Sequence, residues 1–138
     1  MLEKNIQGIQ HLGVPVTNLE RSKTFYIQFG FKVVMAKTFT DKTGIVHAAM
    51  LKKDNLTVEL YELPEKECLE IGNREDGHID HIALDVKDID QALKEIRTAG
   101  LDVLEENAPV FLPFWDLGVK YFTVRGPDGE KIEFNQIL

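Results

Sequence analysis

A weak internal repeat constrains this chain more than any other feature of its sequence. The pattern of residues 79–103 predicts a strand that carries His81, then a helix, then a Gly-ended turn into another strand. Residues 9–33 show the same pattern, with His11 in the place of His81. Self-similarity of this kind indicates a fold assembled from copies of one supersecondary unit. The sequence therefore predicts two such units in series.

Alternating apolar residues and turn-forming residues predict the elements of the first copy. A strand at 8–16 precedes a helix that begins at a capping box of Thr17 and Glu20 and ends at Gly30. Three further strands are predicted at 31–39, 45–51 and 56–62. The first copy is therefore predicted to have the order β-α-β-β-β.

The second copy is predicted to follow the same order. Its first strand covers 79–86, and Asp88, with Gln91 three residues on, caps a helix that ends at Gly100. The other predicted features are a strand from Val103, a loop at 105–118, strands at 119–124 and 131–137, and a Gly126–Gly129 turn between the last two strands. The second copy is thus also expected to be β-α-β-β-β.

The two copies are expected to form one domain of the α+β class. Residues 6–63 would be the first module, residues 78–138 the second, and residues 64–77 a polar connector rich in Glu. A unit of roughly 60 to 70 residues buries only a modest core, whereas two packed units reach the size of an ordinary domain. We therefore expect a single domain over residues 1–138.

The charge and the cysteine content exclude several classes of protein. A net charge of −7 argues against a nucleic-acid interface, which requires a basic patch. No apolar run reaches the roughly 18 residues of a membrane span, and the first residues lack the apolar core of a signal peptide. Cys68 is the single cysteine, so neither an internal disulfide nor a Cys-based zinc cluster is expected. We expect a cytoplasmic protein without nucleic-acid or membrane partners.

Strand alternation places one polar residue of each module's first and last strand on the face opposite the predicted helices. These residues are His11 and Glu59 in the first module, and His81 and Glu133 in the second. Two imidazoles and two carboxylates suit Zn, Ni, Co, Mn or Fe(II) and do not form a calcium cage. The four residues are therefore candidate metal ligands.

The repeat strengthens this interpretation. A single His in a strand is more often a hydrogen-bonded structural residue, and a single Glu is more often solvated. Here His11 and Glu59 stand at nearly the same sequence separation as His81 and Glu133. Two matched His-then-Glu pairs are hard to obtain by chance, so the metal-site interpretation is preferred.

The chain resembles the vicinal oxygen chelate superfamily, which includes glyoxalase I, fosfomycin-resistance proteins, methylmalonyl-CoA epimerase and extradiol dioxygenases. The resemblance covers nearly the whole chain. It rests on Ile9-Gln-His-Leu-Gly-Val-Pro-Val with Ser22 to Tyr26, on Val58-Glu-Leu-Tyr, on His81-Ile-Ala-Leu-Asp-Val, and on Gly126-Pro-Asp-Gly-Glu-Lys-Ile-Glu. It implies paired βαβββ modules in a curved mixed sheet that cups one divalent metal, with His11, Glu59, His81 and Glu133 as the ligands.

The order His, Glu, His, Glu is similar to that of bacterial-type glyoxalase I. The epimerase commonly has Gln at the second position, and the dioxygenases and fosfomycin proteins usually have His there. The resemblance implies a lactoylglutathione lyase-like enzyme with Ni or Zn, which moves a proton in a metal-chelated α-hydroxycarbonyl (a hemithioacetal) through an enediolate. Glu133 or Glu59 would be the catalytic base. Glyoxalase I usually carries an Arg for a glutathione carboxylate near Pro15, where this chain has no cation, so the thiol stays open.

Three other functions are alternatives. An epimerase and an extradiol dioxygenase would use the same fold and a metal. A resistance protein that sequesters a small molecule would need no catalysis, but that branch lacks the metal ligands that His11, Glu59, His81 and Glu133 represent here.

Four further residues are candidates for contact with a small-molecule substrate: His47, Phe114, Trp115 and Lys120. His47 has an equally good structural interpretation, the aromatic pair could pack at the sheet rim or on a second subunit, and Lys120 could simply be solvated. Similar proteins also imply a homodimer. In such a dimer, a shared site would combine His11 and Glu59 of one chain with His81 and Glu133 of the other. In the alternative, a monomer, both modules would close one site.

Overall fold

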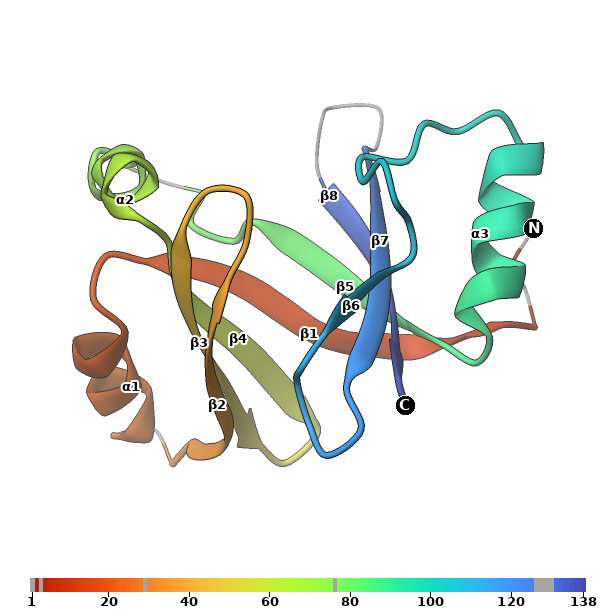
Figure 1. Ribbon diagram of the computed structural model, residues 1–138. Helices are drawn as coiled ribbons and strands as arrows, with labels where there is room; N and C mark the ends of the chain where they lie inside the picture. Colours follow the sequence, from red (N-terminus) through yellow and green to blue (C-terminus); the bar gives the residue numbers. More distant parts are fainter. Residues whose placement is uncertain (1, 3, 29, 76, 126–130) are drawn as a thin grey trace. The chain divides into compact units, whose positions relative to one another are not determined.

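The computed structural model describes residues 2, 4–28, 30–75, 77–125 and 131–138, and in these it contains eight strands and three helices (Figure 1). The elements are β1 (Ile6–Val16), α1 (Leu19–Ile27), β2 (Lys32–Thr40), β3 (Ile45–Lys53), β4 (Leu56–Glu62), α2 (Glu65–Gly72), β5 (His81–Val86), α3 (Ile89–Thr98), β6 (Val110–Leu112), β7 (Val119–Arg125) and β8 (Lys131–Ile137). The predicted α+β class and the β-α-β-β-β order of each module are confirmed.

These elements fall into two compact units. The N-terminal unit comprises His11–Asp80, and the C-terminal unit comprises His81–Leu138 together with the segment that precedes His11. The sequence placed residues 6–10 in the first module. In the structure they belong with the C-terminal unit, because the first residues of the chain bind α3.

In the N-terminal unit the strand order is β2-β3-β4-β1. The strands β1 and β4 are parallel, and the β2–β3 and β3–β4 pairs are antiparallel. The helix α1 packs on one face of this sheet, where the buried apolar residues are Val16, Leu19, Ala49, Leu51, Val58 and Leu60. Their alternation along β3 and β4 leaves Met50 and Glu59, which are cross-strand partners, on the other face.

The start of α1 differs from the prediction. Asn18, and not Thr17, is the N-cap, and its Oδ1 accepts a hydrogen bond from the backbone N–H of Arg21 at 2.8 Å. Glu62 accepts a second bond, from the N–H of Leu19 at 2.6 Å. The predicted capping box was wrong because Asn18, one residue after Thr17, caps the helix, and Glu62 from β4 supplies a second acceptor for the first turn.

The predicted polar connector contains a helix, α2, and this is a second correction. The helix follows Pro64, has Glu65 and Glu67 in its first turn, and buries Ile71. Acidic residues in the first turn interact favourably with the helix dipole. The Glu residues of the connector therefore favour a helix, and this helix packs through a single buried apolar residue, Ile71.

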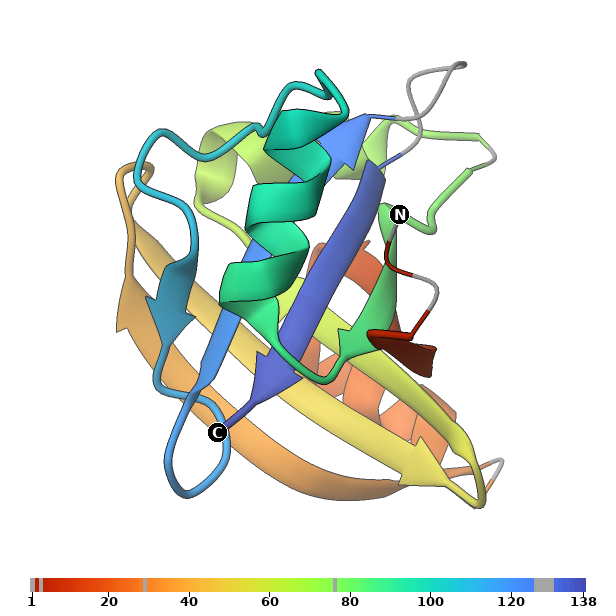
Figure 2. The same cartoon turned by 90° about the vertical axis from the view of Figure 1, so that its right-hand side faces the viewer.

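In the C-terminal unit the strand order is β5-β8-β7-β6. The strands β5 and β8 are parallel, and the other pairs are antiparallel. Figure 2 shows α3 lying along β7 and β8. The core of the C-terminal unit includes Val86, Ile89, Ala92, Leu93, Ile96, Phe122, Val124 and Phe134. The rings of Phe122 and Phe134 stack at a centroid distance of 4.9 Å, and Asp88 caps α3 as predicted, accepting from the N–H of Gln91 at 2.9 Å.

The loop predicted at 105–118 contains the short strand β6, and Val103 forms only an isolated bridge with Val124. The Glu105 carboxylate accepts the backbone N–H of Thr123 at 2.7 Å. Near Val103, the Glu105 side chain therefore occupies a backbone donor of β7. Regular strand pairing with β7 begins only at β6. The predicted Gly126–Gly129 turn lies outside the described residues.

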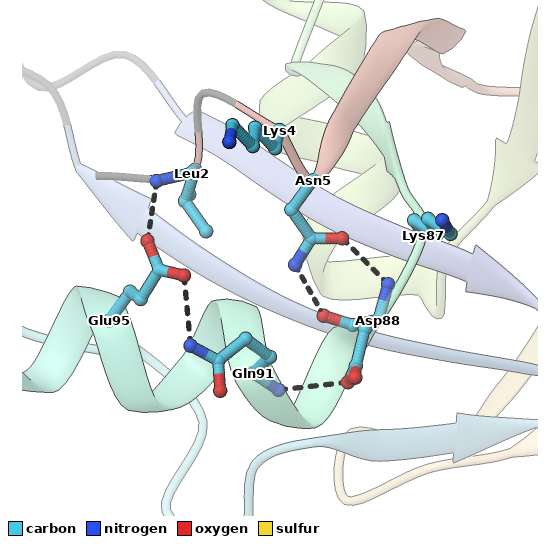
Figure 3. Close-up of a pocket in the computed structure, with 7 residues that line it drawn as sticks. All are labelled: Leu2, Lys4, Asn5, Lys87, Asp88, Gln91 and Glu95. Carbon is cyan, nitrogen blue, oxygen red and sulfur yellow. Dashed lines mark hydrogen bonds between the residues drawn. The ribbon is translucent and has the colours of Figure 1, made fainter.

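The N-terminal segment is tied to the start of α3 (Figure 3). The Asn5 side chain donates to the carbonyl oxygen of Asp88 at 2.6 Å and accepts from its N–H at 2.7 Å. The backbone N–H of Leu2 donates to the Glu95 carboxylate at 2.5 Å. These bonds fix the segment against α3, and Leu2 joins the core residues beside the helix. None of the helices in the described residues is long and apolar enough to cross a membrane.

Candidate functional site

The first His–Glu pair lies within the N-terminal unit. His11 and Glu59 come from the adjacent parallel strands β1 and β4, where Gly13 is the register partner of Glu59. His11 Nε2 is 3.2 Å from a Glu59 carboxylate oxygen, and both residues are less than 10% exposed. The pair occupies the sheet face opposite α1, as the alternation with Val58 and Leu60 predicts.

The second pair repeats this arrangement within the C-terminal unit. His81 and Glu133 come from the adjacent parallel strands β5 and β8, where Ala83 is the register partner of Glu133. His81 Nε2 is 3.5 Å from Glu133 Oε2, and both residues are again buried. The other carboxylate oxygen, Oε1, accepts a hydrogen bond from Asn135 Nδ2 at 2.8 Å.

The geometry of each pair fits two ligands of one small divalent cation. Imidazole and carboxylate ligands bind zinc at about 2.0 to 2.2 Å, which separates neighbouring ligand atoms of a tetrahedral centre by about 3.3 to 3.6 Å. The observed separations of 3.2 and 3.5 Å match this spacing. Burial also favours it, because a metal cation would offset the cost of burying a charged carboxylate. Each unit thus supplies one nitrogen and one oxygen donor, and a single centre with all four ligands stays a prediction.

Asp85 and Cys68 are among the groups whose pKa values are shifted. Burial raises the pKa of Asp85, which lies on β5 on the same sheet face as His81. Burial, followed by the nearby Glu62 carboxylate, raises the pKa of the Cys68 thiol, whose S–H donates to the carbonyl oxygen of Leu63 at 2.8 Å. A raised pKa disfavours the thiolate, which is the nucleophilic form of a cysteine.

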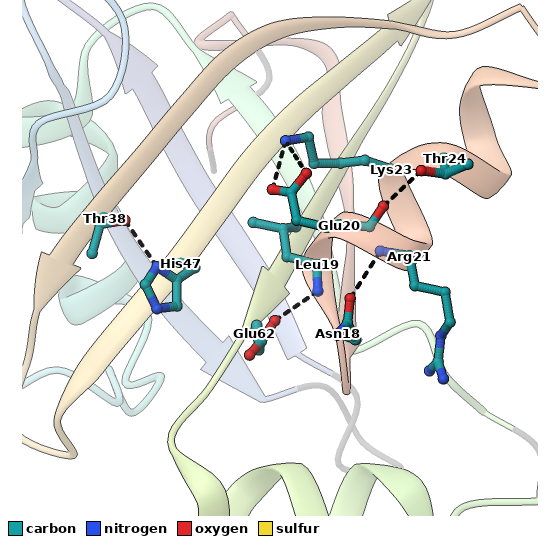
Figure 4. A network of polar contacts seen from close by, with 9 residues as sticks. All are labelled: Asn18, Leu19, Glu20, Arg21, Lys23, Thr24, Thr38, His47 and Glu62. Atoms are coloured by element: carbon teal, nitrogen blue, oxygen red, sulfur yellow. Dashed lines mark hydrogen bonds and ion pairs between the residues drawn. The ribbon is translucent and has the colours of Figure 1, made fainter.

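The structure places His47 away from the first pair. Its cross-strand partner on β4 is Glu62, and alternation puts both on the face of α1, opposite Glu59. There it hydrogen-bonds Thr38 at 2.9 Å and lines a surface pocket of about 430 Å³ beside α1 (Figure 4). This placement gives no support to the predicted contact between His47 and a substrate at the metal.

The other three residues predicted to contact a substrate lie in different parts of the C-terminal unit. Lys120 is the partner of Gln136, whose side chain binds the start of α3, so Lys120 lies on the α3 face, opposite Glu133. Phe114 is 2% exposed and belongs to the core. Trp115 is half-buried in a left-handed conformation (φ 62°), and its Nε1 has no hydrogen-bond partner among the described residues. Its contact with a substrate stays a prediction.

Two polar residues beside the second pair were missed by the sequence reasoning. Asp85 and Asn135 are register partners, each two residues beyond Ala83 and Glu133 on the same sheet face. Strand parity counted from His81 and Glu133 could have placed both residues on the same sheet face as the pair. Without the register of β5 and β8, their proximity could not be inferred.

Comparison with known proteins identifies the family. The family model for the glyoxalase/bleomycin resistance protein/dioxygenase superfamily matches residues 8–134. The chain belongs to this superfamily. The resemblance found in the sequence is thereby confirmed, and the match spans both units.

Individual relatives agree with this assignment. The uncharacterized protein YwbC of Bacillus subtilis is 31% identical over 129 residues, which are 93% of this chain and 96% of that protein. A variant of methylmalonyl-CoA epimerase from Streptomyces coelicolor, solved with 2-nitronate-propionyl-CoA, has a TM-score of 0.77 at 23% identity and covers 95% and 97% of the two chains. Methylmalonyl-CoA epimerase from Mycobacterium tuberculosis has a TM-score of 0.76 at 17% identity, with 96% and 89% covered. These structural likenesses establish the fold.

Proposed function

We propose that this protein is a metal-dependent lyase or isomerase of the glyoxalase I kind, which moves a proton in an α-hydroxycarbonyl substrate. The observation that carries this proposal is the repeated buried His–Glu pair, with one copy in each unit. A buried pair used only for stability would not need to recur at equivalent strands of both modules. Recurrence on the faces opposite α1 and α3 favours one functional centre.

The proposed ligands are His11, Glu59, His81 and Glu133, and the favoured metals are Ni and Zn. When held by these residues, such a metal would supply Lewis acidity toward adjacent substrate oxygens, which would make the neighbouring C–H more acidic. Two arrangements are open to the proposal: one chain supplies all four ligands, or two chains of a homodimer each contribute one pair to a site. Both arrangements fit the two units.

The proton transfer is assigned to a carboxylate of this chain. Glu133 or Glu59 would accept the proton from one carbon and return it to the neighbouring carbon. Asn135 holds one oxygen of Glu133, so the other oxygen keeps its orientation toward His81. Burial of both carboxylates excludes bulk water, which protects the transferred proton from exchange.

An epimerase is the second candidate. The solved structures with similar folds include methylmalonyl-CoA epimerases. The same base chemistry would then remove and return a proton at a single carbon. Glu59 favours the glyoxalase-like reaction, because the resembled epimerase commonly has Gln at that position.

The experiment compares wild type with Glu59→Gln and Glu133→Gln, fully loaded with Ni or Zn, on adducts of methylglyoxal with several thiols. Glutamine retains an oxygen donor but cannot accept the proton, so at least one variant should lose about 10²- to 10⁴-fold in kcat. It should still bind metal. Glu62→Gln is the matched control, because Glu62 lies on β4 but faces α1.

Solvent deuterium exchange at the substrate carbon is measured in parallel. Exchange on an acyl-CoA substrate, without turnover of any thiol adduct, would favour the epimerase. If the loaded wild type gives neither product nor exchange, the proton-transfer proposal is wrong, and oxygen consumption with a catechol or simple ligand binding would then identify a dioxygenase or a sequestering protein.

A further inference from the structure

Asn135 leaves a buried hydrogen-bond acceptor beside the second His–Glu pair. The residue is 3% exposed, and its Nδ2 donates to Glu133 Oε1 at 2.8 Å. Because an ionised carboxylate only accepts hydrogen bonds, this contact fixes which end of the amide faces Glu133. The amide oxygen, Oδ1, is buried and has no partner among the described residues. Such unpaired buried atoms are rare in native proteins and call for an explanation.

A second acceptor stands next to it. Asp85 on β5 is the register partner of Asn135 on β8, and both lie on the face that carries Glu133. Both are two residues, about 6.6 Å along their strands, from the register pair Ala83 and Glu133. The Asp85 side chain is half-buried and forms no hydrogen bond or ion pair with another described residue.

We propose that Asn135 Oδ1 and the Asp85 carboxyl accept hydrogen bonds from a hydroxyl or ammonium group on the part of the substrate that does not react. This inference rests on the proposed function, since Glu133 positions the reacting part. It also narrows the substrate class. A pair of acceptors binds a donor and repels a carboxylate. With Pro15 in place of a cation, a neutral or cationic thiol adduct fits better than a glutathione adduct.

The test measures binding, so that it does not depend on turnover. Four hydroxamic acids chelate metals through adjacent oxygens and have equal chain length but different ends: butanohydroxamic acid, 3-hydroxypropanohydroxamic acid, β-alanine hydroxamic acid and succinic monohydroxamic acid. Their Kd values for the zinc-loaded protein are measured by calorimetry. The hydroxyl and ammonium probes should bind about tenfold more tightly than the methyl probe, which is the size of one good hydrogen bond. The carboxylate probe should bind most weakly.

Three variants assign the preference to residues. Asp85→Ala leaves the bond between Asn135 and Glu133 intact, and Asn135→Ala removes the amide oxygen directly. Lys120→Ala is the control, because Lys120 lies on the opposite face of the sheet. Loss of the preference in Asp85→Ala or Asn135→Ala, with retention in Lys120→Ala, supports the proposal.

Two results overturn the inference alone: equal affinity of wild type for all four probes, or a preference that survives in both Asp85→Ala and Asn135→Ala. In each case the probes still bind only when zinc is present. If no probe shows zinc-dependent binding, the metal site itself is wrong, and the inference falls with the proposed function. The two failures are therefore distinguishable.

Discussion

At the scale of single residues, Asp85 links stability to pH. Its pKa is raised by burial, so in the folded state its carboxyl keeps its proton to a higher pH than in the unfolded state. Between the ordinary Asp value of about 3.9 and the raised folded value, the folded state binds more protons than the unfolded state. The contribution of Asp85 to the free energy of unfolding must therefore fall as pH rises through this window.

Asp85→Asn should remove this dependence. Relative to wild type, the variant should gain free energy of unfolding as pH rises through the window, and the difference should then level off above the folded pKa. Urea unfolding of both proteins across a series of pH values measures it. Asp116→Asn, at an exposed position, is the control and should show no such trend. Parallel curves for Asp85→Asn and wild type would contradict the prediction.

Gly118 is a second position where one atom decides stability. Its φ is +99°, and an added Cβ would overlap the Phe111 ring and approach the carbonyl oxygen of Leu112 to 3.1 Å. We expect Gly118→Ala to lower the free energy of unfolding by about 2 to 3 kcal/mol, of which about 1 to 2 is the cost of the left-handed backbone.

The control for Gly118 is Gly100→Ala. Gly100 also has a positive φ, +75°, but no atom lies within 4 Å of its ideal Cβ. It should therefore show the backbone cost alone. Chemical denaturation of both variants gives the comparison, and an equal loss at the two positions would show that the Phe111 and Leu112 contacts relax without cost.

At the scale of elements, the sequence predicted those features that depend on residues close together in the chain. Asp88 and Gln91 are close in sequence, so the cap of α3 could be predicted. The N-cap of α1, Asn18, binds Arg21 just as locally, and only the second acceptor, Glu62, comes from a distant strand. The strand predicted from Val103 is reduced to an isolated bridge, where Glu105 binds a backbone donor of β7. Strand parity predicted that each His–Glu pair lies opposite its helix. It could not supply the strand register, and so it missed Asn135.

The link between the N-terminal segment and α3 gives a prediction at this scale. Asn5→Ala removes both side-chain bonds to the Asp88 backbone, and should lower the free energy of unfolding by about 2 to 3 kcal/mol. The backbone amide of Asp88 should also exchange its hydrogen faster, because its acceptor is lost. Asn107→Ala, at an exposed turn, should change neither quantity. Unchanged exchange at Asp88 in Asn5→Ala would contradict the role of Asn5.

At the scale of the whole molecule, the two His–Glu pairs are predicted to act as one centre. Removal of one ligand from either pair should then weaken metal binding to a similar degree. At a free metal concentration of about 100 Kd, bound metal stabilises a folded protein by about 2.7 kcal/mol. Wild type should gain about this much with Ni or Zn, and His11→Ala and His81→Ala should both lose most of it. Full retention in either variant would remove that residue from the ligand set.

The same variants decide whether a site belongs to one chain or to two. If the chain forms a homodimer with shared sites, His11→Ala and His81→Ala damage different halves of each site. A mixed dimer then contains one site with both defects and one intact site. Mixing the two inactive variants should therefore restore up to half of the activity and of the tight metal binding in each mixed dimer.

Subunit exchange must be demonstrated in the same sample, for example by mass spectrometry of differently labelled chains. If each chain closes its own site, every site in the mixture still carries one defect, and neither activity nor tight binding returns. No recovery despite proven exchange would therefore reject shared sites and favour one chain that contributes both His–Glu pairs. Recovery in proportion to the fraction of mixed dimers would establish that a second copy of the chain completes the centre.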